Sequence, residues 1–111
     1  MSAKRSGGEL VQGTLDLLIL KALSQEPMHG WGIARSIELQ SRSVLRIEEG
    51  SLYPALRRLE RDGFVTGKWA ISDNNRRARY YALTARGRRR LQSEQERWCA
   101  VVRAMSLVLE S

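Results

Sequence analysis

The segment "EEGSLYPALRRLERDG", residues 48–63, has the pattern of a short amphipathic helix. Leu52, Leu56 and Leu59 are spaced four and three residues apart, so a helix would place them on one face. Gly63 follows the last turn, at the position where a helix commonly ends on a residue in the left-handed conformation. The segment therefore predicts a helix that buries its leucines and ends at this glycine.

The face opposite the leucines is small at its beginning and cationic further along. Pro54 lacks a backbone N–H and suits only the first turn, which predicts an N-cap at Gly50 or Ser51. At about 100° per residue the outward positions are Gly50, Pro54, Arg57 and Arg61, with Ser51 and Arg58 on one flank and Tyr53 on the other. Small residues at a helix N-terminus admit a phosphate, and arginine can bind phosphates or guanine edges. The alternative is that the arginines only solvate an exposed face.

Helices also precede this segment. Apolar residues cover nearly every direction of residues 14–26, which predicts a helix buried on several sides, and Pro27 ends it. Residues 28–40 predict a second, amphipathic helix with two glycines near its start, where they allow close backbone approach. We interpret "SVLRI", residues 43–47, as a short edge strand that pairs with a later segment.

A hairpin and a long helix follow. Residues 64–72 and 78–84 favour β-structure and flank the turn-forming residues 73–77. Thr84 is the expected N-cap of a helix that continues to the C-terminus. Three helices followed by a hairpin are the winged helix-turn-helix arrangement. The sequence thus predicts a mainly α fold with a β-hairpin wing and a long C-terminal dimerisation helix.

The domain prediction is a disordered leader at residues 1–8, a winged-helix DNA-binding domain at 9–83 and a dimerisation helix at 84–111. No secretion signal or apolar run of about 20 residues is visible, and Cys99 is the only cysteine, which indicates a cytoplasmic protein without a membrane span. No Cys/His cluster has metal-ligand spacing, and no acid, base and nucleophile converge. We therefore expect no enzymatic activity, no metal and no cofactor.

Positive charge is concentrated in the second half of the chain. The formal net charge is +7, from 19 Lys and Arg against 12 Asp and Glu. Residues 57–90 hold eleven basic and three acidic residues, so this stretch contains all of the surplus. Arg76, Arg77 and Arg79 lie at and just after the hairpin turn, where a wing contacts phosphates or the minor groove. The arginines at 86–90 could extend this track, but a tolerated surface is the simpler interpretation for them.

The C-terminal helix has an apolar stripe that one small domain cannot cover completely. A second copy is the simplest partner, and a twofold pair would read a palindromic site in double-stranded DNA. The expected dimer interface comprises Leu91, Trp98, Val102, Met105 and Leu109. The alternative is packing on the first helix of the same chain. We expect both: the beginning of the helix packs on its own chain, and the rest packs on the partner.

The tryptophans allow two interpretations. Trp98, with Val101 and Val102, is either interface packing or one wall of a pocket for a planar aromatic molecule, and packing is the simpler explanation. Trp31 and Trp69 are predicted to fill core or interdomain surface. His29 is expected to make a hydrogen bond at a helix start.

Four blocks of the sequence resemble, in order, the PadR family of bacterial transcriptional regulators. They are "GTLDLLILKAL" (13–23), "HGWGIARSIE" (29–38), "EEGSLYPALRRLERDGFV" (48–65) and "NNRRARYYALTARGRRRL" (74–91). The resemblance is to the short form with one C-terminal helix. It implies a winged-helix homodimer that represses promoters and, in many members, is released by a small, often aromatic, molecule.

The resemblance also implies site residues. DNA contact is assigned to Ser51, Tyr53, Pro54 and Arg57 in the third helix and to Arg76, Arg77 and Arg79 in the wing. The residues alone leave one other class open, a winged helix used as a protein-interaction module with no specific DNA target. Preference for one duplex over random DNA separates the two.

Overall fold

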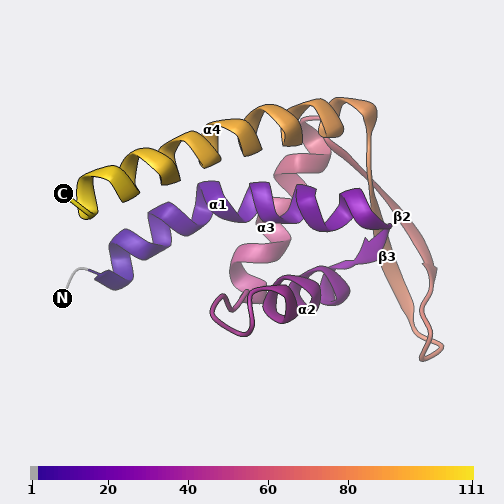
Figure 1. The fold of residues 1–111 in the computed structure, drawn as a ribbon. Coiled ribbons are helices and arrows are strands. Elements are labelled where there is room, and N and C mark those ends of the chain that lie inside the picture. Colours follow the sequence, from indigo (N-terminus) through magenta and orange to yellow (C-terminus); the bar gives the residue numbers. More distant parts are fainter. Residues whose placement is uncertain (1–2) are drawn as a thin grey trace.

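The computed structural model describes residues 3–111, with side chains from residue 13 onward (Figure 1). Its elements, in order, are α1 (Ala3–Gln25), β1 (Met28–His29), α2 (Gly30–Gln40), α3 (Glu49–Arg61), β2 (Val65–Ile71), β3 (Arg77–Leu83) and α4 (Ala85–Leu109). Helices α1 and α4 run antiparallel beside each other, and the hairpin of β2 and β3 projects beyond the helices (Figure 1). This is the predicted winged helix-turn-helix with a long C-terminal helix. The predicted disordered leader, residues 1–8, is described only in part. Residues 3–8 are part of α1, and residues 1 and 2 lie outside the described residues.

Two predictions about the helix ends are confirmed. His29 is the N-cap of α2, where its Nδ1 accepts a hydrogen bond from the backbone N–H of Gly32 at 3.0 Å, as predicted. Gly63 follows α3 with φ of 81°, a left-handed conformation that a side chain disfavours. The N–H of Gly63 donates to the carbonyl of Glu60 and that of Phe64 to the carbonyl of Leu59, so two of the carbonyls in the last turn are satisfied.

The predicted N-cap of α3, Gly50 or Ser51, was wrong: the N-cap is Glu48, two or three residues earlier. The helix begins at Glu49, and the N–H groups of Ser51 and Leu52 donate to the carbonyl of Glu48 at 3.0 and 2.9 Å. Pro54 therefore lies in the second turn. Its missing N–H leaves the carbonyl of residue 50 without a helical donor, but Gly50 is exposed, so no polar group is buried unsatisfied.

The strand predicted at residues 43–47 was also wrong. These residues form an irregular loop, in which Ser43 has a φ of 65°. The N–H of Leu45 donates to the hydroxyl of Ser41, and that of Ile47 to the carboxylate of Glu38. The side chains of Glu38 in α2 and of Ser41, the C-cap of α2, thus accept from the backbone donors that a strand would have used.

The third strand is instead β1, before α2. The sheet order is β1-β3-β2, with Met28 opposite Tyr81 and both pairs antiparallel. Because side chains alternate along a strand, one hairpin face carries Val65, Gly67, Trp69 and Ile71 on β2 opposite Leu83, Tyr81, Arg79 and Arg77 on β3. Val65 and Tyr81 are buried, so this face, called the inner face below, is the one that looks toward the helices.

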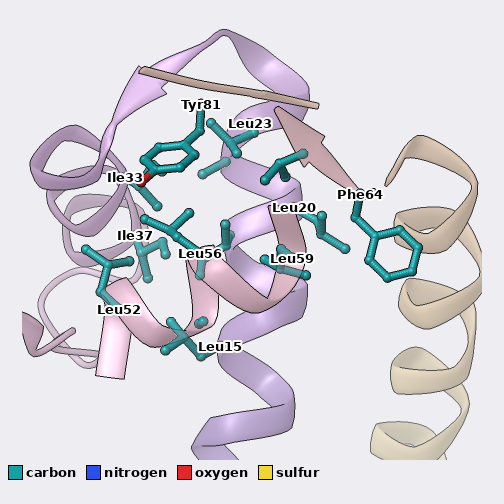
Figure 2. Packing of buried hydrophobic residues seen from close by; sticks show 14 of the residues in the cluster. Leu15, Leu20, Leu23, Ile33, Ile37, Leu52, Leu56, Leu59, Phe64 and Tyr81 are labelled. Atoms are coloured by element: carbon teal, nitrogen blue, oxygen red, sulfur yellow. The ribbon is translucent and has the colours of Figure 1, made fainter. Parts of the chain in front are cut away.

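The core lies among α1, α2, α3 and the base of the hairpin (Figure 2). Its fully buried side chains are Leu15, Ile19, Leu20, Ile33, Leu52, Leu56 and Val65. Figure 2 shows Phe64 beside α4, at the edge of the cluster. The predicted leucine face of α3 is confirmed, because Leu52, Leu56 and Leu59 are all buried.

The predicted burial of two tryptophans was wrong. Trp31, in the first turn of α2, is 63% exposed, and Trp69, in β2, is 54% exposed. Within residues 3–111, no helix combines the length and apolar character that a membrane crossing requires.

Candidate nucleic-acid interface

Only some of the residues predicted on the outward face of α3 are exposed. Ser51 and Arg57 are exposed, whereas Pro54 and Tyr53 are half-buried. Arg57 makes no ion pair within residues 13–111, and Arg61 pairs only with its neighbour Asp62, at 3.2 Å, while staying largely exposed. The free cation on this face is therefore Arg57, with Arg61 beside it at the helix end.

Arg58 is turned away from that face. Its Nη2 donates to Oδ1 of Asp16 in α1 at 2.8 Å, and both side chains are about one-third exposed. Burial raises the pKa of Asp16 above its ordinary value, and the charge of Arg58 only partly offsets that effect. The ion pair holds α3 on α1, and the DNA contact predicted for Arg58 stays a prediction that would require this pair to open.

Alanine substitutions at the neighbouring residues Arg57 and Arg58 should affect the free energy of unfolding differently. Arg58→Ala should lower the free energy of unfolding at pH 7 by about 1 kcal/mol or less, since the pair is partly exposed. The loss comes from the unpaired Asp16 carboxylate. Its folded-state pKa is raised, so this cost is fully present above that pKa and disappears as pH falls through it.

Urea unfolding of Arg58→Ala at pH 7 and near pH 4 measures this difference. Arg57→Ala is the matched control and should leave the free energy of unfolding within about 0.5 kcal/mol at both pH values. A loss for Arg58→Ala that is the same at both pH values would contradict the role given to Asp16.

Arg79 also forms an ion pair within the chain. Its Nη2 donates to Oε2 of Glu60 in α3 at 2.7 Å, and its guanidinium lies 5.7 Å from the ring centre of Trp69. A Cβ at Gly67 would lie 2.6 Å from Nε of Arg79, so the missing side chain of Gly67 makes room for it. This arginine ties the wing to α3, and the DNA contact predicted for it stays a prediction that would require the pair with Glu60 to open.

The remaining wing arginines are free. Arg76 and Arg77 are exposed and make no ion pair within residues 13–111. Arg77 places its guanidinium 4.7 Å from the ring centre of Trp69. At the start of α4, Arg86 and Arg90 lie 4.9 and 5.1 Å from the ring centre of Phe64, so these two pack on the domain surface.

An open groove of about 810 Å³ separates the wing from α2 and α3. Its aromatic lining consists of His29, Trp31, Tyr53, Trp69 and Tyr81, and its cationic lining consists of Arg76, Arg77 and Arg79. Sequence reasoning missed the two tryptophans as surface residues. The signal was present in β2, where Trp69 and Ile71 share the parity of buried Val65 but lie closer to the turn, beyond the reach of the helices.

The stripe of α4 is exposed beyond its first turns. Trp98, Val101, Val102, Met105 and Leu109 are all exposed. Leu91 is buried in the core of its own chain, so its assignment to the dimer interface is corrected. A smaller hollow of about 310 Å³ lies between α1 and α4, lined by Trp98 and Val101 among others, but Val102 is not part of it. Among the side chains of residues 13–111, no three His, Cys, Asp or Glu residues gather as metal ligands would.

The fold and this surface define a winged-helix protein with a C-terminal helix. The model of the transcriptional regulator PadR-like family matches residues 19–93. A transcriptional regulator of Mycobacterium tuberculosis is 31% identical over 87 residues, which cover 78% of each chain. The chain therefore belongs to the PadR-like family of transcriptional regulators, as the sequence blocks predicted.

Solved structures of transcriptional regulators share this fold. A PadR family transcriptional regulator from Eggerthella lenta superposes with a TM-score of 0.79 at 29% identity, covering 98% of this chain and 93% of that one. One from Clostridium difficile gives 0.72 at 28% identity, covering 85% and 96%. A regulator from Clostridium thermocellum, at 24% identity, shares the fold with a TM-score of 0.80, covering 88% and 95%.

Proposed function

We propose that this protein binds specific double-stranded DNA as a homodimer and represses transcription in the cytoplasm, without catalytic activity. The observation that carries the proposal is the set of cations left free on one surface, Arg57 on α3 and Arg76 and Arg77 on the wing. The neighbouring Arg58 and Arg79 are neutralised by carboxylates, whereas these three are not. A helix face that enters the major groove beside a basic wing suits DNA.

The exposed stripe on α4 supports the dimer. Trp98, Val102, Met105 and Leu109 form an apolar surface on one helix, with Val101 beside them. A second copy would cover it and would place two α3 helices about one turn of DNA apart, on a palindromic operator. We further propose that a planar aromatic molecule releases the DNA by binding at Trp98, Val101 and Val102, where the α1–α4 hollow would meet the partner helix.

Selection of bound fragments from a random duplex library tests the function. Retained sequences should share a palindromic motif, and the protein should sediment as a dimer at the concentration used. Random retention, or indifference to DNA, would instead favour a protein-interaction module. Fluorescence titration with planar aromatics tests the effector separately, because quenching should disappear in Trp98→Ala.

Arg57→Ala should affect binding without affecting folding. If Arg57 reads a base, the change should cost about 1–3 kcal/mol on the selected site and relax preference at one position of each half-site. Electrophoretic mobility shifts on the selected duplex and on its single-position variants measure this. Equal weakening on every duplex would make Arg57 a phosphate contact instead.

A further inference from the structure

The inner face of the wing continues past the core without a cover. Near its base Val65 and Tyr81 are buried, whereas nearer the turn Trp69 and Ile71 are 54% and 64% exposed. Large apolar side chains are costly to leave in water, and the hairpin turn itself does not require them. A partner outside the chain would account for this part of the sheet face.

The opposite wall of the groove also has an exposed tryptophan with an arginine against its ring. Trp31, at the start of α2, is 63% exposed and has the guanidinium of Arg35 5.6 Å from its ring centre. Across the groove, Trp69 has the guanidinium of Arg77 at 4.7 Å. Each wall therefore presents an indole surface with a cation held against it.

The lining requires an occupant that is both anionic and apolar. Arg79 lines the groove but is paired with Glu60, whereas Arg76 and Arg77 make no ion pair within residues 13–111. Asp73 is the carboxylate among the described lining residues, so the balance of charge is positive. A DNA strand has phosphates that would face the guanidinium groups and deoxyribose rings whose C–H surfaces would contact the indoles. The groove also adjoins α3, since Tyr53 belongs to both.

We propose that Trp31 and Trp69 grip one DNA strand, which passes through the groove between α2 and the wing while α3 reads the bases. This inference rests on the proposed function. The two indoles add affinity that does not depend on base sequence, because every nucleotide offers the same sugar and phosphate. Trp31 thereby extends the interface to α2, outside both α3 and the wing.

Alanine variants at the two tryptophans test the grip. Trp31→Ala and Trp69→Ala should each bind the selected duplex and random duplex about tenfold more weakly, with an unchanged ratio between them. Leu39→Ala is the control: Leu39 is on α2, is 62% exposed and does not line the groove, so this variant should bind like the wild type. Thermal melting should be nearly unchanged in all three, since each side chain is mostly exposed.

Salt dependence separates an indole contact from an indirect effect on Arg77. Losing an indole should lower affinity at every salt concentration and leave the slope of log affinity against log salt unchanged, because no counterion is released by a neutral side chain. Arg77→Ala should reduce that slope by about one per protomer. A reduced slope in Trp69→Ala would mean that Trp69 only positions Arg77, and would overturn the grip at that residue.

Hydroxyl-radical footprinting locates the strand. The wild type should protect a short run of sugars beside each half-site, and both tryptophan variants should lose that protection while keeping the protection within the half-site. Selective binding by the wild type, with tryptophan variants that match Leu39→Ala, would overturn this inference and leave the proposed function intact. A wild type without any duplex preference would overturn both.

Discussion

Raising the salt concentration from about 50 to about 200 mM should weaken binding of the selected duplex about 1,000-fold. The estimate counts Arg57, Arg76 and Arg77 of both protomers as phosphate contacts, about six in a dimer; if Arg57 reads a base, about four remain and the slope is about −4. Each neutralised phosphate releases condensed counterions, so the slope of log affinity against log salt should be about −5. Fluorescence anisotropy of a labelled duplex over this salt range measures the slope.

The internal ion pairs provide the control for this prediction. Arg58 and Arg79 are held by Asp16 and Glu60, so Arg58→Ala should change the slope far less than Arg76→Ala or Arg77→Ala. A flat response to salt would be incompatible with binding through phosphates. An equal change in slope for Arg58→Ala and Arg77→Ala would show that the ion pairs open on DNA.

Gly87→Ala should destabilise the fold by about 3 kcal/mol and lower the melting temperature by roughly 15 °C. Gly87 is buried in the first turn of α4, and a Cβ there would collide with the backbone carbonyl of Phe64 and lie 2.7 Å from Leu83. That carbonyl already accepts hydrogen bonds from the N–H and the hydroxyl of Thr84, so the backbone has little freedom to move. Relief would require the start of α4 to leave the domain.

Gly13→Ala is the matched control, because it makes the same exchange inside a helix. A Cβ at Gly13 would meet nothing within 4 Å, so this substitution should stabilise the protein by up to about 1 kcal/mol through the helix preference of alanine. Calorimetric melting of the two variants compares them directly. Similar melting temperatures would contradict the close packing of α4 on Phe64.

Local signals predicted most of the fold. The leucine spacing of α3, the left-handed Gly63 after it, the N-cap Thr84 and the His29 hydrogen bond each depend on residues a few positions apart. The order of helices, hairpin and long helix followed from these signals together. The start of α3 differs from the prediction because an exposed second turn can lose the one hydrogen bond that Pro54 cannot donate.

The strand assigned to residues 43–47 shows a different limit. Its residues do favour β-structure, but Leu45 and Ile47 pack against the core, and their backbone N–H groups donate to the side chains of Ser41 and Glu38. The edge of the sheet was taken by Met28 and His29 instead. Pairing across a sheet depends on which segments meet in space, and composition within five residues does not contain that information.

The candidate site divides along the same line. The sequence by itself determined which residues form the helices and the wing, and that positive charge gathers on the segments from α3 to the start of α4. Only the tertiary structure decided which arginines are free. Arg58 finds its carboxylate 42 residues away and Arg79 finds its own 19 residues away, whereas Arg57, Arg76 and Arg77 find none within residues 13–111. The physical reason is that helical and strand periods are set by neighbours along the chain, while an ion pair or an exposed tryptophan depends on which distant surface the fold brings near it.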